Sequence, residues 1–321
     1  MSTPLVSVIM NCYNGEQFLR EAIDSIYEQT YQNWEIIFWD NASSDDSANI
    51  ALSYDKKIKY FRADKTLPLY EARGIAVKKA KGDFIAFLDC DDWWDKEKLK
   101  KQLPLFEDPA IGFVYGHFWV ENELKHTRKI VSQKFHTGAS LVDDLLKQYS
   151  IGMLTLIIRR SSYRNLEQGF DKRFSVIGDF DIVLRLAAEF KSSFIDEPIG
   201  HYRWHGKNYS ITNIKESSEE LTEWYSSIQL HSVISKSKEL YNIPIMINYS
   251  QGMYYMKKGL KTEGFKFLLK IPFFILLASI LLNSCSSLPG SDARKFPPDP
   301  RERVKQNIEQ GKGFRLMDKV G

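Results

Sequence analysis

Three carboxylates follow directly after a short apolar run of the chain. Phe84–Leu88 is apolar and partly aromatic, and Asp89, Asp91 and Asp92 come next. Carboxylates this close repel one another and stay ionised together only when a positive charge compensates them. Oxygen ligands without an accompanying set of His and Cys favour Mg²⁺ or Mn²⁺ over zinc. The segment therefore predicts a divalent-cation site suited to a substrate diphosphate, whereas the structural alternative is that Asp92 only caps the following helix.

The periodicity of apolar residues predicts the elements that position these acids. Strand-length runs alternate with segments of helical spacing through the first hundred residues. Alternation of this kind is typical of an α/β fold with a doubly wound, mostly parallel sheet and helices on both faces. The expected strands are 5–10, 34–39, 58–61 and 84–88, and the expected helices are 16–29, 47–54, 69–79 and 96–106.

Right-handed crossovers would bring the loops after these strands to one edge of the sheet. Three polar loops occupy that position, namely Asn11–Asn14, Asp40–Ser44 and Asp89–Asp92. Ligands of open α/β sheets bind outside the carboxyl ends of the strands. We therefore expect a nucleotide-type cleft at this edge.

A second acidic cluster opens a later helix. Asp179 and Asp181 precede apolar residues at helical spacing, and acids in a first turn also favour the helix dipole without any catalytic role. Before this helix, 113–120 reads as a strand whose hairpin partner lies within 124–134. Both interpretations of Asp179, catalytic and structural, remain open on the residues alone.

Composition excludes several classes of protein. The chain has 321 residues, 43% hydrophobic and 26% charged, which is ordinary for a globular protein. A formal net charge of +3 gives no reason to expect nucleic acid as a partner. The cysteines, Cys12, Cys90 and Cys285, form no CxxC pair, so neither a zinc motif nor a disulfide framework is expected. The N-terminus enters a strand at once, so we expect no secretory signal.

The order and spacing of five motifs resemble the family 2 glycosyltransferases of GT-A fold. The motifs are Val6–Gly15, Glu35–Asp45, Glu71–Gly74, Gly82–Leu88 and Asp89–Asp92. The resemblance covers roughly residues 4–212. It implies a nucleotide-diphosphate sugar donor of UDP, dTDP or GDP type, a Mn²⁺ or Mg²⁺ cofactor, and inversion at the anomeric carbon.

The resemblance also assigns roles to individual residues. Asp179 would be the catalytic base, and Asp91, Asp92 and His205 would be metal ligands. Residues assigned to the nucleotide-sugar are Asn11, Tyr13, Asp40, Asn41, Arg73, Asp89, Asp91 and Arg203. Inverting transfer needs a group that takes the proton of the attacking hydroxyl, while a metal offsets charge on the leaving diphosphate.

The chain departs from the family pattern at three positions. Asn41 stands where relatives carry a second acid, and an amide both donates and accepts where a carboxylate only accepts. Gly74 follows Arg73 where relatives commonly have Asn. Gly178 stands where relatives carry an acid before the base. The nucleobase is therefore left open.

The C-terminal part changes character. We expect a GT-A domain over 1–212, a helical region over 213–270, and an apolar segment with a disordered polar tail over 271–321. Lysines flank the apolar stretch, so 257–282 is expected to contact an anionic membrane surface, a buried C-terminal helix being the alternative. The segment around Cys285 resembles a lipoprotein signal placed internally, which suggests a fusion or read-through.

The sequence thus predicts an inverting, metal-dependent glycosyltransferase of bacterial polysaccharide biosynthesis, cytoplasmic or peripheral on the inner face of the membrane. Its acceptor would be a glycan or a lipid-linked hydroxyl. One alternative is a sugar-1-phosphate nucleotidyltransferase, although Asn11–Glu16 is a poor match to the phosphate loop of that class. Another alternative is a non-catalytic sugar-nucleotide-binding or scaffold protein, since two expected acids are missing.

Overall fold

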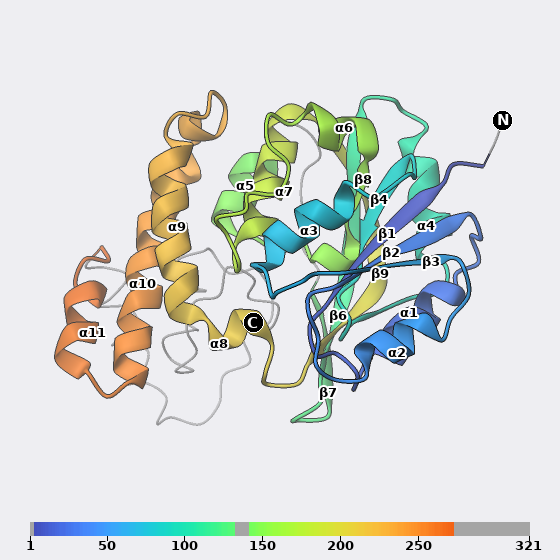
Figure 1. The fold of residues 1–321 in the computed structure, drawn as a ribbon. Helices are drawn as coiled ribbons and strands as arrows, with labels where there is room; N and C mark the ends of the chain where they lie inside the picture. Colours follow the sequence, from blue (N-terminus) through green and yellow to red (C-terminus); the bar gives the residue numbers. More distant parts are fainter. Residues whose placement is uncertain (1–2, 132–140, 273–321) are drawn as a thin grey trace, which may run out of the picture. The chain divides into compact units, whose positions relative to one another are not determined.

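The computed structural model describes residues 3–131 and 141–272 (Figure 1). The described residues form two compact units. The first contains the residues up to Val142 together with Ser150–Asn208, and the second contains Asp143–Tyr149 and the residues from Tyr209 onward. The expected boundary at 212 stays a prediction.

The first unit is built on one sheet with the strand order β3-β2-β1-β4-β8-β6-β9-β5, and β7 pairs with β6. The first four of these strands are all parallel. They are β1 (Val6–Cys12), β2 (Trp34–Asp40), β3 (Ile58–Arg62) and β4 (Phe84–Phe87). Every residue of β1, β2 and β4 is buried, as expected of strands covered on both faces.

The other half of the sheet is mixed. It contains β5 (Trp93–Trp94), β6 (Ile111–Asn122), β7 (Thr127–Val131), β8 (Ile157–Arg159) and β9 (Lys191–Trp204). Strand β8 is antiparallel to both β4 and β6, and β9 runs parallel to β6. The α/β fold and the hairpin after 113–120 are confirmed. The antiparallel pairs of β8 with β4 and β6, and of β5 with β9, were not expected, because local periodicity carries no information on strand direction.

Short helices follow strands β1, β2, β3 and β5 along the chain. They are α1 (Leu19–Tyr27), α2 (Ser47–Leu52), α3 (Leu69–Val77) and α4 (Lys98–Gln102). Helix α3 packs against β1 and β2, and α1 packs against β5 and α2. The helix expected over 96–106 becomes α4 followed by a 3₁₀ turn, Leu103–Phe106, because Pro104 has no N–H to continue the α-helical hydrogen bonds.

Two further helices belong to the first unit, α6 (Arg160–Asn165) and α7 (Gly178–Glu189). The second unit contains α5 (Leu141–Lys147), α8 (Tyr209–Thr212), α9 (Ile214–Ile228), α10 (Asn242–Lys257) and α11 (Lys261–Leu268). Its core includes Trp224, Tyr249 and Leu268, all buried. Among residues 3–131 and 141–272, no helix is long and apolar enough to cross a membrane.

The predictions made for the apolar segment from 273, for Cys285 and for a disordered tail lie outside the described residues.

Candidate active site

Two polar loops interlock at the carboxyl edge of the parallel strands. The Asn14 N–H donates to Ser43 Oγ at 3.0 Å, and Asn14 Oδ1 accepts the Ser44 N–H at 2.8 Å. The Gly15 N–H donates to Ser47 Oγ at 3.0 Å. Asn14 has φ 51°, a left-handed conformation that Asn tolerates better than most residues. Asn14 and Gly15 therefore join the loop after β1 to the loop after β2.

The side chains of Asp40 and Asn41 both form hydrogen bonds within the protein. Asp40 is buried; its carboxylate accepts from the Ser43 N–H and the Tyr60 hydroxyl and pairs with Arg62. The Asn41 amide donates to the Leu67 carbonyl at 2.8 Å and accepts the Leu67 N–H at 3.1 Å. An amide can make both bonds whereas a carboxylate can make only one. Asn41 thus holds the 63–68 segment, and a contact of either residue with a base stays a prediction.

Asn11 differs from its neighbours. It is 7% exposed, and neither polar atom of its side chain has a hydrogen-bond partner among the described residues. The indole N–H of Trp39, which is in register with Asn11 on the next strand, is also buried without a partner there. Buried polar groups are nearly always hydrogen-bonded. Two such groups at one strand end fit a site that receives a polar ligand. Nearby, Tyr13 is 55% exposed.

A second group of side chains gathers around α3. Arg73 is buried and forms an ion pair with Asp89, which follows β4. The guanidinium also lies over the Tyr70 ring, 5.0 Å from its centroid. Burial raises the pKa of the Tyr70 hydroxyl well above its usual value, and the Asp179 charge raises it further. The structure therefore brings the predicted residues Arg73, Asp89 and Asp179 together.

Tyr70 is a site residue that the sequence analysis missed. A Cβ added at Gly178 would lie 2.3 Å from the Tyr70 ring, closer than atoms can approach. The Tyr70 ring thus fills the space that a side chain at position 178 would need. This packing gives a physical reason for the absence of an acid before Asp179. In the sequence, the large side chain of Tyr70 in α3 is the only sign of this contact.

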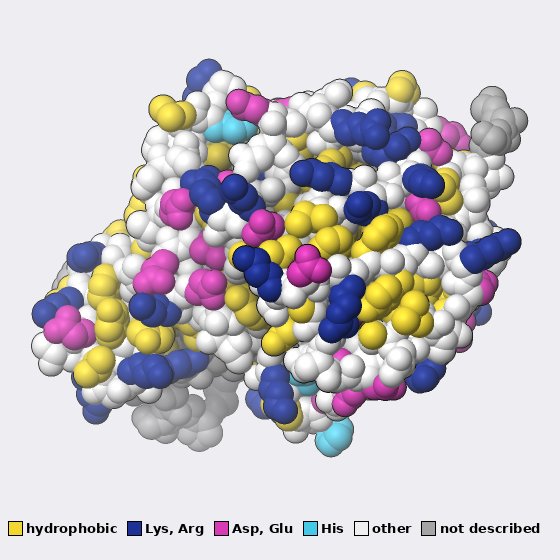
Figure 2. Space-filling model, in the orientation of Figure 1, with side chains coloured by type: hydrophobic (Ala, Val, Ile, Leu, Met, Phe, Trp, Pro, Cys, Tyr) yellow, Lys and Arg dark blue, Asp and Glu magenta, His cyan; other side chains and the backbone are white. Residues whose placement is uncertain are grey.

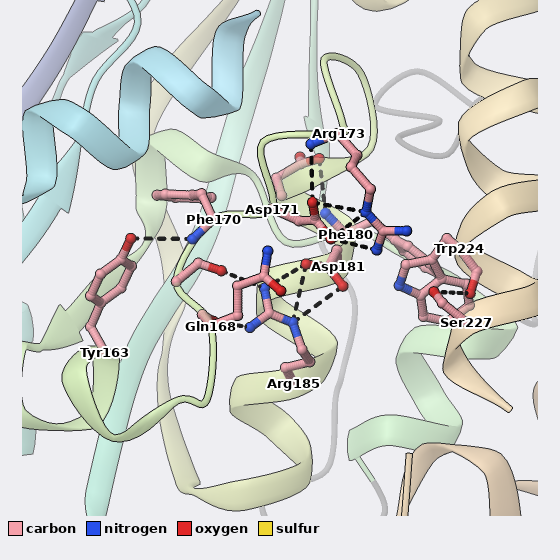
Figure 3. Close-up of polar contacts among 12 residues, drawn as sticks. Tyr163, Gln168, Phe170, Asp171, Arg173, Phe180, Asp181, Arg185, Trp224 and Ser227 are labelled. Carbon is pink, nitrogen blue, oxygen red and sulfur yellow. Dashed lines mark hydrogen bonds and ion pairs between the residues drawn. The ribbon is translucent and has the colours of Figure 1, made fainter. Parts of the chain in front are cut away.

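The loop before α7 is fixed to that helix by charged side chains (Figure 3). Arg185 pairs with Asp181 one turn earlier and donates to the carbonyls of Gln168 and Gly169. The Tyr163 hydroxyl accepts the Phe170 N–H at 3.2 Å. Asp181 therefore has a structural partner. Asp179 is 1% exposed and interacts electrostatically with Tyr70 and Arg73.

Asp171 and Arg173 complete this loop. Burial raises the pKa of the Asp171 carboxyl, but hydrogen bonds and the charge of Arg173 outweigh burial and lower it overall. The loop thus carries its own ion pair, at 2.6 Å.

The predicted metal ligands lie on two segments. Asp91 Oδ2 and His205 Nε2 are 3.1 Å apart. Asp92 is buried, and its Oδ1 accepts the Arg203 N–H at 3.0 Å. Among the described residues, no group of three or more His, Cys, Asp or Glu converges as a metal site. Asp91 and His205 alone offer one oxygen and one nitrogen, which fits a Mn²⁺ ion that takes its other ligands from a nucleotide diphosphate. Asp92 as a third ligand stays a prediction.

Cys12 and Cys90 lie close together, although they are far apart in sequence. Both are free thiols. A Cβ added at Gly15 would lie 2.7 Å from Cys90 Sγ and 2.9 Å from Cys12 Sγ. A glycine is therefore required where the loop after β1 passes over the end of β4.

These features define an α/β fold of GT-A type. The solved structure of TarS residues 1–349 from S. aureus, in complex with UDP-GlcNAc, has a TM-score of 0.62 at 15% identity and covers 97% of this chain and 93% of that one. A mannosyltransferase of Pyrobaculum calidifontis, in complex with GDP-Man and Mn²⁺, has a TM-score of 0.63 at 14% identity, covering 97% and 85%. At such identities the likeness concerns the fold.

Sequence relatives add the family. Residues 7–166 match the model of glycosyl transferase family 2. The Escherichia coli glucosyltransferase WfgD, named as acting from UDP-Glc on α-D-GlcNAc-diphosphoundecaprenol, is 36% identical over 50% of this chain. The Bacillus subtilis protein TuaG, named as a putative teichuronic acid biosynthesis glycosyltransferase, is 33% identical over 49% of it. The chain spans 62% and 63% of the lengths of these two relatives. It belongs to glycosyl transferase family 2.

Proposed function

We propose that the chain transfers a sugar from a nucleotide-diphosphate donor to a hydroxyl of a glycan or lipid-linked acceptor in bacterial surface polysaccharide biosynthesis. The observation that carries this proposal is the gathering of Arg73, Asp89 and Asp179 around Tyr70 at the carboxyl edge of the parallel strands. Both named relatives are glycosyltransferases, and one name specifies a lipid-linked acceptor.

The mechanism would be a single inverting displacement. Asp179 takes the proton of the acceptor hydroxyl as its oxygen attacks the anomeric carbon, and the nucleoside diphosphate leaves from the opposite face. Its electrostatic interaction with Tyr70 and Arg73 supports this role, because it puts the carboxylate within the polar group of the candidate site. No covalent nucleophile is needed.

The donor would lie along the strand edge. Asn11 and Tyr13 would meet the nucleoside, which the buried and unpartnered polar atoms of Asn11 support, and Arg73 lies beside Asp89. Asp91 and His205 would hold a divalent ion, which would offset negative charge on the leaving diphosphate. Solved structures of this fold hold UDP-GlcNAc or GDP-Man, so both nucleobases are compatible with the fold. The Asn41 amide already bonds to the Leu67 backbone, so the choice between nucleobases is left to the nucleotide panel.

We further propose peripheral contact with the inner face of the cytoplasmic membrane through α11 of the second unit. Phe265 and Leu269 are 50% and 69% exposed on this helix. Lys258, Lys261 and Lys266 are close to them in the sequence, and Figure 2 shows basic and hydrophobic side chains side by side on the part of the surface where α11 lies. A basic helix face with exposed apolar residues binds anionic lipid, and a lipid-linked acceptor would be presented there.

A nucleotide panel tests the proposed function. UDP, dTDP, GDP, CDP and ADP would each be added with and without Mn²⁺, and the unfolding temperature measured. A ligand that binds only the folded state raises this temperature by mass action. We expect one nucleotide to give a shift that depends on Mn²⁺. A folded sample that responds to none of the five would contradict the proposal and favour a non-catalytic scaffold.

A further inference from the structure

Arg203 lies in a continuous series of ring contacts at the end of β9. Its guanidinium carbon is 4.4 Å from the ring centroids of both Phe18 and Trp93. The Trp93 ring stacks on His201, with centroids 4.7 Å apart and planes within 7°. On the other side, Phe18 lies 5.4 Å from His205. The series thus runs from His201 through Arg203 to His205, the residue that meets Asp91.

The polar contacts of Arg203 reach the loop that contains Asp91 and Asp92. Its backbone N–H donates to Asp92 Oδ1 at 3.0 Å, and its Nε donates to the Asp91 carbonyl at 2.9 Å. The two remaining nitrogens pair with Glu123, after β6, and with Glu21, in the first turn of α1. The side chain of Arg203 is only 9% exposed. Every nitrogen of the guanidinium therefore has a partner within the protein.

We propose that Arg203 is a positioning residue for the metal site and not a ligand of the diphosphate. This rests on the proposed function. Two carboxylates already compensate the single positive charge of Arg203, so an incoming diphosphate would meet no free cation. The Arg203 side chain holds the Asp91 carbonyl and, through Phe18, the ring of His205, while its backbone N–H holds Asp92. Arg203 thereby holds the metal-binding oxygen and nitrogen at their separation.

The two roles predict opposite behaviour for a lysine substitution. A lysine keeps the charge and serves as a point contact for phosphate, but it lacks the planar fork and the ring stacking that the series requires. If Arg203 binds the diphosphate, the lysine in Arg203→Lys should largely take over this role. If Arg203 is a positioning residue, the lysine should not take over the role.

The test uses Arg203→Lys and Arg203→Gln, with Arg159→Lys and Arg159→Gln as matched controls. Arg159 also donates to carbonyls and lies near two aromatic rings, but it pairs with Phe84 at the start of β4, away from the site edge. Two quantities are measured. One is the affinity for UDP and GDP without metal. The other is the affinity for Mn²⁺ with saturating nucleotide, read from the electron paramagnetic resonance signal of free Mn²⁺.

We expect both Arg203 variants to raise the Mn²⁺ dissociation constant by about 10- to 100-fold, as loss of a group that orients metal ligands does. Metal-free nucleotide affinity should stay unchanged, and the Arg159 controls should match the wild type. A loss of metal-free nucleotide affinity in Arg203→Gln that Arg203→Lys restores would overturn the proposal. So would unchanged Mn²⁺ affinity in both Arg203 variants.

A second variant covers the case in which Arg203 substitutions do not fold. Glu21→Gln with Glu123→Gln leaves the arginine in place but removes both of its anionic partners. A positioning role predicts weaker Mn²⁺ binding, whereas a phosphate-binding role predicts tighter metal-free nucleotide binding because the cation is released. If the wild type itself binds no nucleotide with Mn²⁺, the proposed function fails. If the wild type binds but the Arg203 variants behave as a diphosphate ligand predicts, only the proposal for Arg203 fails.

Discussion

Asp179 is the residue on which the proposed chemistry depends. It is buried in the first turn of α7, near the Tyr70 hydroxyl and the Arg73 guanidinium. Asp181, two positions later, is equally buried but pairs with Arg185. The two acids of one helical turn thus have different surroundings, and single substitutions can separate their roles.

Asp179→Asn should lower kcat by about 10²- to 10⁴-fold, because an amide cannot accept the proton of the acceptor hydroxyl. Donor affinity should change little, since a base acts mainly in the transition state. Steady-state kinetics and nucleotide titration measure both. In the control Asp181→Asn, we expect lower thermal stability with kcat retained. Equal turnover in Asp179→Asn and wild type would contradict the assignment.

Asn41→Asp should lower the free energy of unfolding by about 1–3 kcal/mol, because a carboxylate cannot donate to the Leu67 carbonyl and leaves that acceptor without its partner. Denaturant unfolding measures the change. The same variant should retain the bond that accepts the Leu67 N–H. If its stability equals that of the wild type, the 63–68 segment is held by other contacts.

Helices α3 and α7 meet through one glycine. Gly178 leaves room for the Tyr70 ring, which interacts with both Arg73 on α3 and Asp179 on α7. The glycine at position 74, in the same helix as Tyr70, faces open space apart from Phe170 at 3.7 Å. Position 74 therefore has room for a side chain, whereas position 178 does not.

Gly178→Ala should destabilise the protein by about 1–3 kcal/mol, because the added methyl group overpacks the Tyr70 ring. Gly74→Ala is the matched control and should be neutral or stabilising by up to about 1 kcal/mol, since alanine favours a helix interior. Chemical denaturation measures both. Shortening the neighbour in Tyr70→Ala should relieve the effect of Gly178→Ala, and additive losses in the double variant would exclude the clash.

Strands β5, β6 and β9 are joined by His201. Its Nδ1 lies 2.9 Å from Glu121 Oε1, and its Nε2 lies 3.7 Å from Asp95. Burial lowers the pKa of His201, but the hydrogen bonds and charges of Asp95 and Glu121 outweigh burial and raise it overall.

A raised folded pKa means that protonated His201 stabilises the fold. This contribution is fully present below the unfolded pKa of about 6.5 and is lost as pH rises through the higher folded value. His201→Gln should therefore reduce the unfolding free energy more at acidic than at alkaline pH. Unfolding curves at several pH values check the sign. A loss that grows with pH would mean that neutral His201 is the stabilising form.

At the scale of the whole molecule, the chain joins a unit of GT-A fold to a helical unit whose last described helix is basic and partly apolar. The first unit carries the candidate site, and the second carries the exposed face of α11. Anionic lipid attracts surface lysines by about 1 kcal/mol for each residue near the membrane.

Lys261→Glu with Lys266→Glu should abolish most binding to vesicles that contain phosphatidylglycerol, while wild-type binding should weaken as salt rises. Vesicle co-sedimentation measures the bound fraction. Lys56→Glu with Lys78→Glu makes the same charge change at exposed positions of the first unit and serves as the control. Equal losses in the two variants would indicate attraction by net charge alone.

The sequence by itself determined the parallel half of the sheet and the edge where the site lies. Runs such as Val6–Cys12 and Phe84–Phe87 are local signals, because a strand buried on both faces is apolar over most of its length. The acids after those strands follow from chain order alone. Only the tertiary structure decided the features that local patterns cannot predict. These are the antiparallel pairing of β8, the packing of Tyr70 against Gly178, the proximity of Cys12 and Cys90, and the ion pair of Arg203 with Glu21. Each depends on groups far apart in sequence, and Arg203 alone contacts residues 112 and 182 positions away. A residue type can show that a cation or a carboxylate is present, but only packing decides whether its charge is already compensated.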